Sequence, residues 1–123
     1  MSSTRSLRSL AALTAIGVTG AVAVPAFAHA PVVGTFPRNH ATVSHVRTVG
    51  VRFGESIVTG LITVEGANGS TVPARTSGLQ PSNHARMRAA FTRRLHAGRY
   101  RVTWRVRADD GDTERGSFRF TVR

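Results

Sequence analysis

Alternating apolar and polar side chains near the C-terminal end predict two long strands. Apolar residues at every second position from Tyr100 to Val106 are separated by arginine and threonine, and the same period recurs from Ser117 to Val122. A period of two puts successive side chains on opposite faces of a strand, so that one face lies in a core and the other in water. We therefore expect a hairpin whose inner face is centred on Trp104.

Shorter segments upstream carry the same signal. Residues 31–37 predict an edge strand because prolines bound them, and residues 46–53, 61–65 and 85–92 predict three more strands. Residues 66–69 form a turn signal, after which residues 71–75 can pair back as a hairpin, and residues 76–83 are expected to be a loop. About seven short strands without a helical pattern predict an all-β fold, an immunoglobulin-like antiparallel β-sandwich with Greek-key connections.

The first 28 residues have the pattern of a secretory signal peptide. Arg5 and Arg8 precede an apolar run over residues 10–24, and Ala26-Phe27-Ala28 supplies a small-x-small cleavage site. The run is too short and too rich in glycine for a transmembrane helix. We expect cleavage after Ala28, a mature domain over residues 29–123, export to the periplasm or the cell envelope, and no stable membrane insertion after cleavage.

The composition excludes several kinds of site and partner. The chain has no cysteine, so that disulfides and thiolate metal sites are impossible, and its formal net charge is +11. Such a charge suggests an anionic partner, but an exported protein rarely meets nucleic acid, which we therefore do not expect as a partner. The simplest interpretation is that arginines keep exposed strand faces soluble and blunt the sheet edges.

Two features suggest a metal site instead. Cleavage after Ala28 leaves His29 at the new N-terminus, where its amine and imidazole can chelate one ion, and nitrogen with oxygen donors suits Cu(II). The loop between the last two strands holds four of the six carboxylates of the chain, Asp109, Asp110, Asp112 and Glu114. This local excess of acid in a basic protein predicts the other half of the site.

At this point the sequence resembles the CopC family of exported copper-resistance proteins. The resemblance spans the mature chain in order: His29-Ala30 after the signal, Thr35-Phe36-Pro37, Phe53-Gly54-Glu55, the run from Gly98 to Val106, Asp110-Gly111-Asp112, and the run from Gly116 to Val122. The Gly-x-Tyr-x-Val-x-Trp run followed by Asp-Gly and Gly-Ser-Phe is the most specific part.

The resemblance implies one Cu(II) ion held by His29, Glu55, Asp110 and Asp112. Asp112 stands where the family pattern has histidine, which replaces an imidazole nitrogen with an anionic oxygen and makes the ligand set harder. It also implies a non-enzymatic carrier or chaperone in copper resistance or homeostasis, which hands copper to a membrane copper-transport protein of the CopD type.

Other interpretations remain open. The acidic loop could hold a Ca²⁺-type ion, or the domain could be a metal-independent interaction module of the cell surface whose arginines bind anionic polymers or lipids. An N-terminal copper-chelating histidine also occurs in oxidative polysaccharide-cleaving enzymes, but these need a second histidine. His84 or His96 could supply a missing nitrogen, although exposed surface histidines are the simpler interpretation, as for His40 and His45. We expect Met87 to be a core residue and no Cu(I) site.

Overall fold

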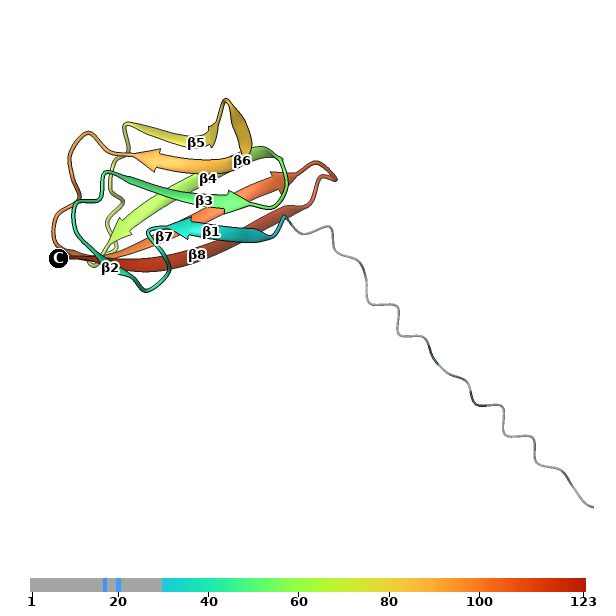
Figure 1. Cartoon of the computed structure of the whole chain (residues 1–123), viewed down its shortest axis with the longest axis horizontal. Coiled ribbons are helices and arrows are strands. Elements are labelled where there is room, and N and C mark those ends of the chain that lie inside the picture. Colours follow the sequence, from blue (N-terminus) through green and yellow to red (C-terminus); the bar gives the residue numbers. More distant parts are fainter. Residues whose placement is uncertain (1–16, 18–19, 21–29) are drawn as a thin grey trace, which may run out of the picture.

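A computed structural model describes residues 30–123, together with positions 17 and 20, and the predicted signal peptide and His29 fall outside this part. Eight strands form two sheets of four (Figure 1). The strands are β1 (Val32–Phe36), β2 (Thr42–Val43), β3 (Thr48–Phe53), β4 (Ile57–Gly66), β5 (Thr76–Gln80), β6 (Asn83–Ala90), β7 (Gly98–Ala108) and β8 (Thr113–Val122). None of the described residues forms a helix able to cross a bilayer.

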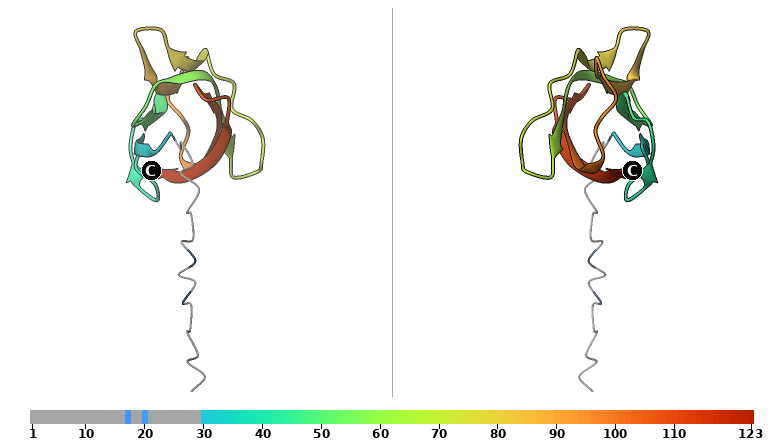
Figure 2. Two further views of the ribbon diagram at one scale, coloured as in Figure 1. Left: turned by 90° about the vertical axis from the view of Figure 1, so that its right-hand side faces the viewer. Right: turned by 90° about the vertical axis from the view of Figure 1, so that its left-hand side faces the viewer.

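One sheet has the strand order β1-β3-β6-β5 and the other β2-β8-β7-β4. Their pairs are antiparallel except for the short β2, which runs parallel to β8. Viewed along the strands, the sheets curve around a common interior (Figure 2). The predicted all-β sandwich is confirmed, with one strand more than the seven that the sequence pattern indicated.

The core lies where the alternation predicts it. Inward positions of β3, β6 and β8 are buried, and Met87 is only 1% exposed, as expected of a core residue. Trp104 differs from the expectation, because it is half-buried and packs against the core instead of filling its centre. Its ring meets that of Phe53 in the opposite sheet edge-on, with centroids 5.3 Å apart.

Two local predictions need correction. The loop expected over residues 76–83 is wrong, since Thr76–Gln80 form β5 and pair with β6. The suggested hairpin over residues 71–75 is reduced to a single bridge between Glu65 and Thr71. β5 escaped detection because its side chains are exposed or half-buried, so that no apolar alternation marks them.

Candidate metal centre

One end of the sandwich brings together three segments that are far apart in the sequence. The first residues of the described chain, the turn between β3 and β4, and the turn between β7 and β8 all lie there, opposite the C-terminus (Figure 1). The N–H of Gly54 donates a hydrogen bond of 2.8 Å to the carbonyl of Pro31. Ala30 is buried, with 2% of its surface exposed. The residue that follows His29 is therefore fixed beside Gly54 and Glu55.

The acidic turn is a compact backbone loop. The N–H of Gly111 donates to the carbonyl of Ala108 at 3.0 Å, and Gly111 has a φ of 88°, which favours glycine. The N–H of Asp112 donates to Oδ1 of Asp110 at 3.0 Å, and the N–H of Ala108 donates to the Asp112 carbonyl at 2.9 Å. The turn thus holds Asp110 and Asp112 close together, with both side chains exposed to solvent.

Pairing of β4 with β7 brings the third segment to this turn. Ile57 lies opposite Ala108, so that the residues just before Ile57 and just after Ala108 share one corner of the molecule. A hollow of about 490 Å³ at this corner is lined by Glu55, His84 and Asp109, among others. His84 comes from β6 of the opposite sheet, and all three side chains are exposed.

The structure therefore gathers the predicted site only in part. Asp110 and Asp112 share the turn, but the carboxylate that shares the hollow with Glu55 is Asp109. No three His, Asp or Glu side chains in the described part of the chain are grouped closely enough to hold a metal ion by themselves. His29 lies outside that part, so the complete set of His29, Glu55, Asp110 and Asp112 stays a prediction.

His84 is the neighbour that sequence reasoning could not single out. The sequence offered His84 and His96 equally as sources of an extra nitrogen, yet only His84 lines the hollow with Glu55. His96 precedes β7, at the start of the strand whose far end leads into the acidic turn. Pro81 and Ser82 turn the chain back from β5 into β6, which begins beside His84, and this turn depends on β5, which the sequence pattern did not reveal.

Comparison with known proteins agrees with the fold. The CopC domain family matches residues 32–123. The structure is similar to that of PcoC, a methionine-rich copper resistance protein from Escherichia coli, with 24% identity, a TM-score of 0.64 and coverage of 78% of this chain and 100% of that one. It is also similar to CopC from Methylosinus trichosporium OB3b, with 25% identity, a TM-score of 0.65 and coverage of 76% and 93%.

No curated protein matches the chain significantly. The family match nevertheless extends over most of the sequence and includes the Glu55 corner, the acidic turn and the strands that carry them. The chain belongs to the CopC domain family.

Proposed function

We propose that the protein is an exported, non-catalytic carrier of copper(II), which binds one ion at the end of the sandwich where the chain enters the fold. The observation that carries this proposal is the hydrogen bond between Gly54 and Pro31, together with the burial of Ala30. These contacts fix the point of entry beside Glu55. Covalent geometry keeps the Cα atom of His29 about 3.8 Å from that of Ala30.

The donors near this corner suit copper(II). His29, once it is the first residue, offers an amine and an imidazole nitrogen, and Glu55 together with Asp110 and Asp112 adds carboxylate oxygens. His84 lines the same hollow as Glu55 and supplies the second imidazole that Asp112 does not provide. A set with two imidazoles selects Cu(II) over hard cations better than a set of carboxylates.

The exposure of these side chains fits a carrier. Glu55, His84, Asp110 and Asp112 are all exposed, so an ion bound among them stays accessible to an acceptor. An accessible ion can pass to a partner by exchange of one ligand at a time. We propose a membrane copper-transport protein of the CopD type as this acceptor, and copper resistance or homeostasis in the periplasm or cell envelope as the setting.

The decisive test is a Cu(II) titration followed by electron paramagnetic resonance. Protein that begins at His29 is compared with protein that carries one extra residue before His29, which removes the free amine from the histidine while keeping every side chain. We expect one equivalent of a signal with nitrogen and oxygen ligation in the first, and loss of that signal in the second. Equal signals, or no specific signal in either, would reject the proposed site, and circular dichroism of both proteins controls for folding.

A further inference from the structure

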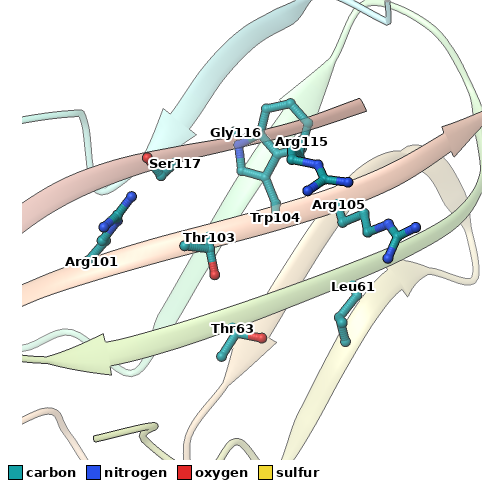
Figure 3. Close-up of a pocket in the computed structure, with 9 residues that line it drawn as sticks. All are labelled: Leu61, Thr63, Arg101, Thr103, Trp104, Arg105, Arg115, Gly116 and Ser117. Atoms are coloured by element: carbon teal, nitrogen blue, oxygen red, sulfur yellow. The ribbon is translucent and has the colours of Figure 1, made fainter. Parts of the chain in front are cut away.

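A second surface, separate from the metal end, is hollowed into the outer face of the β2-β8-β7-β4 sheet. The hollow has a volume of about 400 Å³. Three arginines and three hydroxyl side chains line it, all pointing away from the core (Figure 3): Arg101, Arg105, Arg115, Thr63, Thr103 and Ser117. We call it the arginine groove.

Strand register arranges these side chains in rows across the sheet. Arg105 lies directly opposite Arg115, and four residues along β7 Arg101 lies directly opposite Arg119. Between the two arginine rows, Thr103 stands between Ser117 on one side and Thr63 on the other. Since a strand advances about 3.4 Å per residue, the two arginine rows are about 14 Å apart with a row of hydroxyls between them.

The arginine rows work against the stability of the sheet. Like charges directly opposite each other on neighbouring strands are destabilising. In the first row, the residue of β4 that lies opposite Arg105 is the exposed Leu61, which carries no charge. In the second row, the residue of β4 that lies opposite Arg101 is the acid Glu65. Solubility alone requires only scattered charge. Pairs of arginines at matched positions place two guanidinium groups where one anionic group can accept hydrogen bonds from both.

We infer that the arginine groove binds a linear acidic polysaccharide. Each arginine row binds a carboxylate of the polymer, and the row of Thr63, Thr103 and Ser117 exchanges hydrogen bonds with sugar hydroxyls between the charged groups. The binding step is non-covalent and needs no metal ion. The groove lies along the middle of the sheet, whereas the metal end lies beyond Ala108, so the two sites can be tested separately.

Two other anionic partners fit this surface less well. Single-stranded nucleic acid is bound through several aromatic rings on which successive bases stack. Trp104 is the one aromatic residue among those that line the groove, and its ring also packs edge-on against Phe53 of the opposite sheet. Amphipathic faces that bind an anionic membrane also insert a set of apolar side chains into it. This face is hollowed, and its exposed apolar side chain, Leu61 at 60% exposure, stands among charges and hydroxyls, so the face fits a membrane poorly.

The test uses metal-free mature protein and oligomers of polygalacturonate, which carry one carboxylate per sugar, with binding measured by calorimetry. The variants are R105Q/R115Q and R101Q/R119Q. The matched control is R75Q/R93Q, because Arg75 and Arg93 are exposed, do not line the groove, and their replacement removes the same charge. We expect each groove variant to weaken binding about tenfold, and the control to change it less than about twofold.

An equal loss in all three variants would reduce the effect to net charge and overturn the inference. A further variant, T103A/S117A, keeps every charge and should weaken binding about threefold through the lost hydroxyls; unchanged affinity would overturn the assignment to a sugar polymer. Anionic lipid vesicles and single-stranded DNA serve as competing probes, and tighter groove-dependent binding of either would also overturn it. Thermal unfolding of the groove variants should be no earlier than that of the wild type, since each removes a repulsive pair.

Discussion

The indole ring of Trp104 lies against the backbone of Gly116, its directly opposite partner on β8. A Cβ atom at position 116 would overlap the ring and come within 2.7 Å of its Cε2 atom. Glycine is therefore needed here for space, and it lets the ring pack against β8 while meeting the ring of Phe53 edge-on. The half-buried position of Trp104 follows from this contact.

We predict that G116A destabilises the protein by about 1–3 kcal/mol, because the aromatic ring must move away from a well-packed position. G60A is the matched comparison. There the added Cβ would meet the Met87 sulfur at 2.6 Å, and a flexible thioether can give way, so we expect a smaller loss. Urea unfolding of both variants measures the difference, and a larger loss for G60A would contradict this account.

A second prediction concerns Met87. Its side chain is 1% exposed and belongs to the core, so M87L should cost less than about 1.5 kcal/mol, whereas M87A should cost about 2–5 kcal/mol. Neither change should alter Cu(II) binding or create or remove a Cu(I) site. Urea unfolding of each variant measures the loss of stability, and metal titration measures copper binding. An M87L protein with altered copper affinity would contradict the prediction that Met87 takes no part in copper binding.

The third prediction separates the two imidazoles near the metal end. H84A should remove one nitrogen from the copper spectrum, because His84 lines the hollow with Glu55. H96A is the control, since it removes an equally exposed histidine that does not line the hollow. Pulsed electron paramagnetic resonance counts the nitrogens, and identical spectra for H84A and the wild type would exclude His84 as a ligand.

D112H tests the departure from the family pattern. Restoring an imidazole to the acidic turn should tighten Cu(II) binding about tenfold, because nitrogen donors raise the preference for copper. Asp112 contributes its backbone N–H and carbonyl to the turn, so the exchange of its side chain leaves those hydrogen bonds in place. D109H, at the neighbouring carboxylate, is the comparison. Competition with a chelator of known affinity measures both, and weaker binding by D112H would contradict the proposal.

The fifth prediction uses Tyr100, the one tyrosine in the sequence. Burial raises the pKa of its phenol above the ordinary value of 10.0, and its hydroxyl donates a hydrogen bond of 2.6 Å to the carbonyl of His96. A raised pKa in the folded state means that the contribution of Tyr100 to stability is complete below pH 10 and declines as the pH rises through the folded pKa. Tyrosinate absorbance should therefore titrate later in the native protein than in urea, and Y100F should lose less stability at alkaline pH.

Much of the fold could be predicted because strong alternation survives in the strands that build the core. The inward faces of β3, β6, β7 and β8 all carried that signal, and they are buried as expected apart from the half-buried Tyr100 and Trp104 of β7. β2 and β5 lacked it. β2 has only two residues. β5 contains Gly78, which has a φ of 120°, and ends beside Pro81 of the following turn. Its sequence therefore predicts a loop, although pairing with β6 makes this segment a strand.

The residues of the candidate site could be predicted from the sequence better than their positions relative to one another. The acidic turn and Glu55 stand out in the sequence as rare carboxylates, but only the pairing of Ile57 with Ala108 reveals that Glu55 and Asp109 line the same hollow. His84 could not be distinguished from His96 without that geometry. The arginine groove was visible as alternating charge, whereas the matched rows depend on the register of β7 and β8, which no local pattern specifies.

The placement of the two ends of the fold has a practical consequence for handling the protein. β8 has ten residues and spans about 33 Å, so Arg123 lies a strand's length from the turn that precedes β8. An affinity tag or a surface anchor attached at Arg123 would stand clear of that turn, as the position of the C-terminus in Figure 1 illustrates. A leader left on the other end by incomplete processing would, under the copper proposal, yield preparations that fold normally and bind no metal.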